Sequence, residues 1–242
     1  MSAEGARPVA LVTGATSGLG REVARRLAAD GFSVVVHGRD AARGAAVVSE
    51  ITDAGAQARF AAADLTDVGD IERLAAAAGD VDVLVNNAGF SWFGPTAELD
   101  PATFDRMFAA NVRSAYFLVA AIAPRMAERG AGSIINVGSM GGQIGLAGGA
   151  AYSATKAALG ALTRSWAAEF SPRGVLVNTI APGPVYTDGA APERTTALGS
   201  TTLLARAARV TEIADVIAFL ASPKAGYITG TVIAADGGRT AV

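Results

Sequence analysis

Short apolar segments alternate with longer amphipathic segments along most of this chain. The apolar segments are rich in β-branched residues and stop at glycine or polar residues, as buried parallel strands do. They predict strands at Val9–Thr13, Ser33–His37, Gln57–Ala63, Val81–Val85, Ser133–Gly138, Val175–Ile180 and Thr231–Asp236. The segments between them predict helices at 19–30, 41–54, 67–78, 101–128, 151–171 and 212–221. Strands that alternate with helices indicate an α/β fold with a parallel sheet and helices on both faces.

The composition narrows the classes of function. The 242 residues include 29 glycines, and 51% of the chain is apolar, which suits a compact α/β domain with tight turns. A net charge of −2 without a basic cluster argues against a nucleic-acid partner. The absence of cysteine excludes disulfides, thiolate metal ligands and cysteine nucleophiles, and no metal site is predicted. No linker or repeat divides the chain, so residues 1–242 are predicted to form a single domain.

The first residues, Met1–Pro8, lack the apolar segment of a signal peptide. No run approaches the ~18 apolar residues that a membrane-spanning helix needs. We therefore expect a cytoplasmic protein without membrane association.

One stretch, Ser139–Lys156, carries side chains that together could transfer a proton. Tyr152 and Lys156 are four residues apart in a predicted helix, so they share one face. A phenol with a pKa of about 10 is a poor acid or base at neutral pH. A lysine cation ~5 Å away would favour the phenolate by roughly 3 kcal/mol, about two pKa units, which would make Tyr152 a general acid/base. Ser139 follows a predicted strand, where its hydroxyl could bond the oxygen of a carbonyl or alcohol substrate.

The turn between the first strand and the first helix is glycine-rich. Thr13–Gly20 has the spacing G-x-x-x-G-x-G, which differs from the G-x-G-x-x-G of many dinucleotide enzymes. Glycines here let the backbone approach a pyrophosphate, and the helix N-terminus supplies N–H groups and a positive dipole end. The turn therefore predicts a dinucleotide phosphate site.

Together these motifs resemble the short-chain dehydrogenases/reductases, and the resemblance covers essentially the whole chain. The other motifs of that family follow in order as Asp64-Leu65, Asn86–Gly89, Asn111, Pro182–Thr187, Tyr227–Gly230 and Asp236–Gly238. The resemblance implies a single-domain Rossmann fold with a doubly wound, seven-stranded parallel sheet. It also implies a dinucleotide half at about 8–90, a catalytic and substrate half at about 91–242, and a lid at about 184–210.

The resemblance further implies a role for each site residue. Tyr152 would give a proton to a ketone oxygen or take one from an alcohol, and Ser139 would orient that oxygen. Lys156 would bond the nicotinamide ribose and lower the pKa of Tyr152, and Asn111 would hold a water in the proton path. The implied cofactor-binding residues are Gly14, Thr16, Ser17, Gly18, Leu19, Gly20, Arg39, Asp64, Leu65, Asn87, Ala88, Gly89, Tyr152, Lys156, Pro182, Gly183, Val185 and Thr187.

The end of the second predicted strand bears on the choice between NAD and NADP. An acidic residue there bonds the 2′-hydroxyl of NAD, whereas a nearby arginine accommodates the 2′-phosphate of NADP. The acidic position is Gly38 in this chain, Arg39 follows it, and Asp40 is placed to cap the next helix. We therefore expect NADP(H). The single histidine, His37, is interpreted as part of the packing of the strand.

Three loops that follow strand ends are expected to form the substrate pocket. Their apolar and aromatic side chains indicate a neutral, apolar or aromatic ketone or alcohol. The expected pocket residues are Trp92, Phe93, Met140, Gln143, Leu146 and Tyr186. Members with similar C-terminal motifs usually carry a Pro-Leu-Gly-Arg run where this chain has Leu203–Arg206, and a proline near Val210. The resemblance therefore does not transfer a particular substrate.

Three functions remain open on the sequence. The first is an NADP(H)-dependent ketoreductase or alcohol dehydrogenase. The second is a 3-oxoacyl-carrier-protein reductase, in which Arg129 and Arg173 could meet an acidic carrier. The third is a non-catalytic NADP-binding sensor or scaffold, which the intact catalytic set disfavours.

A homotetramer is also implied by the resemblance. The two helices that start near Pro101 and Ala151 are apolar on more than one face, and such helices are usually buried twice. The apolar residues concerned are Phe108, Tyr116 and Phe117 on the first helix and Leu159, Leu162 and Trp166 on the second.

Overall fold

Seven parallel strands form the centre of the protein, in a computed structural model that describes residues 7–241. They are β1 (Val9–Val12), β2 (Ser33–Gly38), β3 (Gln57–Ala62), β4 (Val83–Asn86), β5 (Gly132–Val137), β6 (Val175–Pro182) and β9 (Val232–Ala235). Their order across the sheet is β3-β2-β1-β4-β5-β6-β9, so the winding direction reverses between β1 and β4. This order confirms the predicted doubly wound Rossmann fold.

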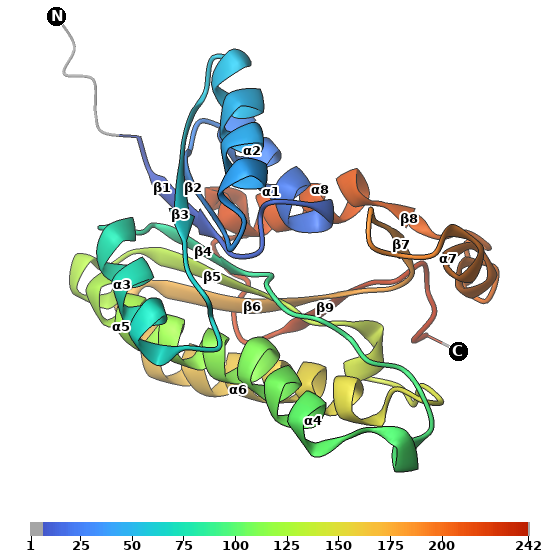
Figure 1. Cartoon of the computed structure of the whole chain (residues 1–242). Helices are drawn as coiled ribbons and strands as arrows, with labels where there is room; N and C mark the ends of the chain where they lie inside the picture. Colours follow the sequence, from blue (N-terminus) through green and yellow to red (C-terminus); the bar gives the residue numbers. More distant parts are fainter. Residues whose placement is uncertain (1–6, 242) are drawn as a thin grey trace, which may run out of the picture.

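Helices cover both faces of the sheet (Figure 1). The first face carries α1 (Gly18–Ala29), α2 (Ala41–Asp53) and α8 (Val210–Ala221), and the second carries α3 (Val68–Ala78), α4 (Pro101–Phe108), α5 (Ser114–Arg129) and α6 (Ala150–Phe170). Short 3-10 turns lie at η1 (Thr96–Glu98), η3 (Met140–Gly142), η4 (Ser171–Arg173) and η5 (Pro223–Ala225). Successive residues of β1 point to opposite faces, so Leu11 enters the core under α3, α5 and α6, and Val12 enters the core under α1, α2 and α8.

Aspartates start two of the helices where the sequence indicated. The Asp40 carboxylate accepts a hydrogen bond from the Arg43 N–H at 3.0 Å, and the Asp100 carboxylate accepts one from the Thr103 N–H at 2.9 Å. These bonds satisfy N–H groups that have no partner within the helix. The predicted capping role of Asp40 is confirmed.

The long helix predicted from Pro101 contains a π-helical turn, η2 (Ala109–Arg113), between α4 and α5. The apolar periodicity did not reveal this turn, because one extra residue per turn shifts the helix face without changing the composition. Short π-helical segments often occur at functional sites. This one carries Asn111.

The continuous helix Pro101–Arg129 has 29 residues and is long and apolar enough, by length and composition, to cross a membrane. The sequence reading had found no such segment. Its inner residues, among them Leu118 and Met126, are fully buried in the core beneath the sheet. Packing within the domain accounts for the apolar character of this inner face.

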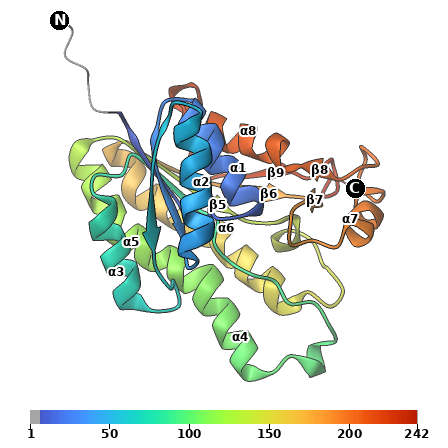
Figure 2. The ribbon, with the colours of Figure 1, turned by 45° about the horizontal axis from the view of Figure 1, so that its top comes forward.

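The lid expected at about 184–210 contains two short strands and a helix. β7 (Val185–Tyr186) and β8 (Ala208–Arg209) pair as a small parallel sheet, and α7 (Pro192–Gly199) connects them. The three elements lie together at one end of the molecule (Figures 1 and 2). Strands of two residues are too short to show an alternation of apolar and polar residues, which is why the sequence did not reveal them.

Candidate active site

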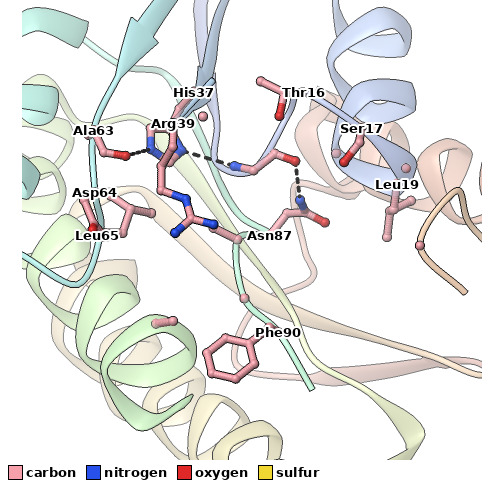
Figure 3. Close-up of a pocket in the computed structure, with 18 of the residues that line it drawn as sticks. Thr16, Ser17, Leu19, His37, Arg39, Ala63, Asp64, Leu65, Asn87 and Phe90 are labelled. Atoms are coloured by element: carbon pink, nitrogen blue, oxygen red, sulfur yellow. Dashed lines mark hydrogen bonds between the residues drawn. The ribbon is translucent and has the colours of Figure 1, made fainter. Parts of the chain in front are cut away.

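A cavity of about 710 Å³ lies at the carboxyl ends of β1 to β4 (Figure 3). Most of the expected cofactor-binding residues line it, namely Gly14, Thr16, Ser17, Gly18, Leu19, Gly20, Arg39, Asp64, Leu65, Asn87, Ala88, Gly89 and Thr187. Open α/β sheets bind ligands in the crevice where the winding direction reverses. The cavity between β1 and β4 lies at that point.

The glycines of the phosphate loop leave space for a ligand. Gly14 and Gly18 have φ angles of 64° and 53°, a region that favours glycine. A Cβ at Gly20 would lie 2.3 Å from the Gly14 carbonyl oxygen, so this position admits no side chain. Ser17, which precedes α1, makes no side-chain cap on it. The loop therefore fits a pyrophosphate at the N-terminus of α1.

A lid carboxylate reaches the same helix end. The Gly18 N–H donates to Oδ2 of Asp188 at 3.2 Å. Asp188 thus places a negative charge where dinucleotide sites bind phosphate. The sequence analysis did not find this contact, because only the docking of the lid brings the two positions together.

The Asn-Asn-Ala-Gly element supports the phosphate loop from β4. The Thr13 hydroxyl accepts hydrogen bonds from the backbone N–H groups of Asn87 and Ala88 at 2.9 and 3.0 Å. The Asn87 amide donates to the carbonyl oxygens of Thr13 and Gly14 at 2.8 and 3.2 Å. These bonds fix the loop on the neighbouring strand, so the Asn87 side chain is engaged with the protein itself.

Thr16 fills the space at the end of β2. A Cβ at Gly38 would lie 2.4 Å from Cγ2 of Thr16, so an acidic side chain there would require Thr16 to move. Arg39 is exposed and forms no salt bridge with the part of the chain that the structure describes. Arg43 also lines the cavity, and its Nε bonds Asp40 at 3.1 Å. The adenosine end of the cavity thus offers cations and no ready carboxylate at position 38.

Ser139, Tyr152 and Lys156 come together at the carboxyl end of β5 and the start of α6, and none of the three lines this cavity. The Ser139 hydroxyl accepts a hydrogen bond from the Gly141 N–H at 3.1 Å and also interacts with the Tyr152 phenol. The Lys156 Nζ lies 5.8 Å from the centroid of the Tyr152 ring and donates to the Val137 carbonyl oxygen at 2.8 Å. The strand end at β5 and the first turns of α6 therefore position the three groups.

The pKa directions differ from the expectation. Burial lowers the pKa of Lys156 from its ordinary 10.5 to about 8. Burial raises the pKa of Tyr152, and the interaction with Ser139 opposes this rise. The predicted lowering of the Tyr152 pKa by Lys156 is therefore not found in this arrangement. Desolvation dominates, and the lysine bonds a carbonyl oxygen rather than the phenol.

Both polar atoms of the Asn111 side-chain amide form hydrogen bonds with other residues of the protein. Its Oδ1 accepts from the Phe90 N–H at 2.9 Å, and its Nδ2 donates to the Phe90 carbonyl oxygen at 2.9 Å and to the Thr155 hydroxyl at 3.1 Å. Thr155 in turn donates to the Tyr152 carbonyl oxygen at 2.7 Å. Asn111 thus connects the loop after β4 to the helix of Tyr152. Both N–H groups of the Asn111 amide are engaged, and one lone pair of Oδ1 accepts from Phe90. A water at this residue could therefore donate only to the second lone pair of Oδ1.

Two of the expected substrate-pocket residues lie beside Tyr152. The Phe93 ring centroid is 5.5 Å from that of Tyr152, and the Arg194 guanidinium lies 4.4 Å from the Phe93 centroid. A Cβ at Gly149 would contact both Phe93 and Leu146, at 3.0 and 3.3 Å. An aromatic wall with one nearby cation therefore borders the phenol.

The other expected residues are placed differently. Trp92 packs over Gly94, Met140 is buried, and Gln143 is exposed. Tyr186 bonds the Thr196 hydroxyl of α7 at 2.9 Å and so helps to hold the lid.

Three expected cofactor residues at the end of β6 do not line the cavity of Figure 3. Pro182 is buried, and Val185 packs against the core under α8. A Cβ at Gly183 would lie 2.7 Å from the Asp236 Cα. These residues position Thr187, which does line the cavity.

Arg129 and Arg173 lie at the opposite edge of the sheet from this site. Arg129 bonds the Val81 carbonyl oxygen at 2.6 Å, just before β4 begins, and Arg173 lies just before β6. Parallel strands present one edge of amino ends and one of carboxyl ends, and the site is at the carboxyl edge. Any contact of these two arginines with an acidic carrier would therefore lie at the edge of the sheet opposite this site.

The fold and the site define a dinucleotide-dependent enzyme of Rossmann type, and comparison with known proteins identifies its family. The model of the short chain dehydrogenase family matches residues 8–198. The chain is 39% identical to cis-4-hydroxycyclohexanecarboxylate dehydrogenase of Sinomonas cyclohexanicum, covering 98% of both sequences. It is 36% identical to 3-oxoacyl-acyl-carrier-protein reductase of Staphylococcus aureus (strain Mu50), covering 95% of this chain and 96% of that one.

Solved structures agree with this relationship. The crystal structure of blue fluorescent protein from a metagenomic library, in complex with NADPH, superposes with a TM-score of 0.90 at 37% identity, covering 96% of this chain and 97% of that one. The chain belongs to the short-chain dehydrogenase/reductase family, and the resemblance drawn from its motifs is confirmed. It is an oxidoreductase that acts on an alcohol or the corresponding ketone.

Proposed function

We propose that this protein is an NADP(H)-dependent oxidoreductase that interconverts a ketone and a secondary alcohol, with a neutral, apolar or aromatic substrate. The observation that carries the proposal is the grouping of Ser139, Tyr152 and Lys156 at the same carboxyl edge of the sheet as a cavity with a glycine-rich phosphate loop. A bound nicotinamide would supply or accept the hydride, and the protein would supply position and proton.

Tyr152 is the group that would exchange a proton with the substrate oxygen. Because burial raises the pKa of its phenol, Tyr152 carries at neutral pH the proton that a ketone oxygen needs. The Ser139 hydroxyl, which interacts with this phenol, would bond the same substrate oxygen. Lys156 would bind the ribose hydroxyls, and the phosphate loop would hold the pyrophosphate.

Replacement of the phenol tests this assignment. Tyr152→Phe should lower turnover by roughly 10² or more, because the transferable proton is removed. Tyr227→Phe is the matched control, since that side chain is fully exposed. Cofactor binding, followed by fluorescence titration, should survive in both variants. A Tyr152→Phe enzyme with near-normal turnover would end the proton-transfer assignment.

The preference for NADP(H) is supported at the end of β2. Thr16 occupies the space that an acidic side chain at position 38 would need, and Arg39 is exposed at the cavity. A relative of known structure has been crystallised with NADPH. A charge-assisted bond between a guanidinium and a phosphate contributes roughly 1.5–3 kcal/mol, which corresponds to about 10- to 150-fold in selectivity.

The ratio of kcat/KM for NADPH and NADH measures this preference. Arg39→Ala should reduce the ratio about tenfold or more, by loss of the phosphate partner. Arg125→Ala is the matched control. Arg125 lies on α5, pairs with Asp80 at 2.9 Å and does not line the cavity. Equal efficiencies with both cofactors, or a ratio that Arg39→Ala does not change, would refute the preference.

Two other substrate classes follow from the relatives and from Arg194. One relative reduces 3-oxoacyl-acyl-carrier protein, and another oxidises a hydroxy acid. Arg194, over the Phe93 ring, is a cation that could meet a carboxylate. A panel of bulky neutral ketones, 2-oxo acids of similar size and a 3-oxoacyl thioester distinguishes the three classes. Acids that are better substrates by about tenfold, with Arg194→Gln removing the advantage, would contradict the neutral substrate.

A homotetramer is part of the proposal. Phe104, Tyr116 and Phe117 are exposed on α4 and α5, at 41%, 47% and 38%, beside a groove of about 510 Å³. Asp105 and Arg113 also line this groove, so a second copy could pair opposite charges across it. By contrast, Leu159 and Trp166 are buried in the core of this subunit and are not available to a partner.

Light scattering at micromolar concentration tests this assembly. We expect a tetramer, and Tyr116→Glu, a charge placed in the groove, should shift the population to smaller species. A ~24 kDa monomer for the unaltered protein would contradict the proposal.

A further inference from the structure

His37 is the only histidine in the chain, and both of its ring nitrogens bond backbone groups of the cofactor cavity. The ring is 3% exposed. Its Nδ1 accepts a hydrogen bond from the Gly14 N–H at 3.1 Å, and its Nε2 lies 3.2 Å from the Ala63 carbonyl oxygen (Figure 3). The ring therefore does more than fill space in β2.

These two bonds determine the protonation of the ring. A backbone N–H can only donate and a carbonyl oxygen can only accept, so Nδ1 must be unprotonated and Nε2 must carry the hydrogen. The ring is thus the neutral Nε2–H tautomer. An imidazolium would turn Nδ1 into a donor that faces the donor of Gly14.

The two backbone partners belong to different loops that line the cavity. Gly14 begins the phosphate loop, and Ala63 directly precedes Asp64 and Leu65, which line the adenosine end. Gly14 has a φ angle of 64°, which glycine adopts readily, and its N–H bonds the His37 ring. Since β2 lies between β1 and β3 in the sheet, His37 is placed to brace both loops at once.

We propose that His37 is a positioning residue for the cofactor site, which holds the phosphate loop and the loop after β3 at a fixed separation only while its ring is neutral. The inference rests on the proposed dinucleotide site. It predicts a cofactor affinity that depends on the acceptor at Nδ1 and that falls in acid.

The charges around the ring fit this behaviour. Burial is the main cause that lowers the pKa of His37 from its ordinary 6.5, and Arg39 lowers it further. The Ala63 hydrogen bond and the Asp64 carboxylate act in the opposite direction. The phosphate loop from Gly14 to Gly20 carries no titratable side chain, and Asp70 of α3 accepts the Asp64 N–H instead of facing the ring.

The sign of the pH effect follows from linkage. Protonation is disfavoured in the folded protein relative to the unfolded chain, so below pH ~6.5 the unfolded chain takes up more protons. Acid thus weakens the native arrangement of the ring, and the cofactor should bind less tightly once the folded protein takes up this proton, which happens at a pH below 6.5. A bound phosphate near Arg39 has a second pKa of about 6 and also titrates in this range, so a non-titrating variant is needed for comparison.

Three substitutions separate the two bonds. In His37→Asn, the amide oxygen can take the place of Nδ1 and accept from Gly14, without titrating. In His37→Gln, the longer amide can donate to Ala63 in place of Nε2 but leaves Gly14 without an acceptor. His37→Leu removes both bonds. Val34→Ala is the control for general destabilisation, because Val34 lies on the same strand, is fully buried and does not line the cavity.

The first measurement is the Kd of NADPH, by fluorescence titration of the full chain between pH 5.5 and 8. At pH 7.5 we expect His37→Asn to lie within about threefold of the unaltered protein, His37→Gln to bind about tenfold more weakly, and His37→Leu at least as weakly. As the pH is lowered through the titration midpoint of His37, the unaltered protein should lose more affinity than His37→Asn. Val34→Ala should lower the melting temperature with no change in Kd.

The second measurement needs no cofactor. After removal of any histidine tag, isotope labelling of histidine gives one imidazole signal set, and the nitrogen shifts report its tautomer directly. We expect the Nε2–H tautomer at pH 7.5 and a titration midpoint below 6.5. An Nδ1–H tautomer, a midpoint above 6.5, or equal Kd values for the Asn, Gln and Leu variants would overturn the inference. If the unaltered protein binds neither NADPH nor NADH, the proposed function fails instead, whatever the tautomer.

Discussion

Lys156 gives the most direct test of the energetics of this site, because a buried lysine should make stability depend on pH. Its side chain is buried on α6, and its Nζ bonds one carbonyl oxygen, that of Val137. Burial lowers its pKa from 10.5 to about 8. Between these two pH values the unfolded chain holds a proton on this lysine that the folded protein has released.

The size of this change in stability follows from the linkage between proton binding and folding. Stability rises with pH wherever the unfolded state binds more protons, so the free energy of unfolding should increase as the pH rises above 8. Integrated from pH 7 to pH 9.5, the lysine contributes a gain of about 2 kcal/mol. Higher pH is avoided because tyrosines begin to titrate near 10.

Urea denaturation of the cofactor-free protein, followed by far-UV circular dichroism at half-unit intervals, measures this gain. Lys156→Met has a similar length and no titrating group, so the difference between the two proteins isolates the lysine. We expect the unaltered protein to gain about 2 kcal/mol relative to Lys156→Met over this range. If the two proteins show parallel pH profiles, Lys156 is not desolvated, and the burial argument for the whole site is wrong.

Three further substitutions test other contacts of the site and core. Asn111→Ala should lower the free energy of unfolding by about 2–4 kcal/mol, because two backbone groups of the loop after β4 lose their partner; an unchanged urea midpoint would contradict this. Thr163→Val should lower the free energy of unfolding by about 1–3 kcal/mol, because the buried Asn136 amide loses its acceptor at 2.8 Å. Thr163→Ser keeps the hydroxyl and should lower it less. Equal losses in the two variants would refute the role of the hydroxyl. Asp188→Asn should tighten NADPH binding about tenfold at low salt, because it removes one negative charge beside the Gly18 N–H, where the cofactor phosphate is expected. Weaker binding in a fluorescence titration would instead mean that the carboxylate anchors the lid.

The strands and most helices could be predicted because their signals are local. Each central strand is buried on both faces, so β1 reads as a continuous apolar run, and Asp40 and Asp100 cap helices within three residues of themselves. The π turn at Asn111 and the short pair β7–β8 left no such signal. Both depend on packing against other elements, α6 for the first, and α7 and α8 for the second.

The candidate site was likewise predictable only where the signals are local. Loops that follow parallel strands must gather at one edge, so the motifs alone indicated which residues share the cavity. The partners within it could not be read from spacing. His37 and Gly14 are 23 positions apart, and Asp188 and Gly18 are 170 positions apart. In the same way, the position of Arg129 on a helix end did not indicate which edge of the sheet that end occupies.

The spacing of Tyr152 and Lys156 predicts that the two residues share a site, but it does not predict how the site shifts their pKa values. Four positions on a helix fix their proximity, and a Coulomb argument then favours the charged pair. Burial acts on both groups in the opposite sense, raising the pKa of the phenol and lowering that of the amine, so it favours two neutral groups. Which effect wins depends on how far each group is removed from water, which is a property of the folded core and of no short segment. The site therefore holds its proton on Tyr152 at neutral pH, and any ligand that places charge or hydrogen-bond partners beside Lys156 will change the acidity of the phenol.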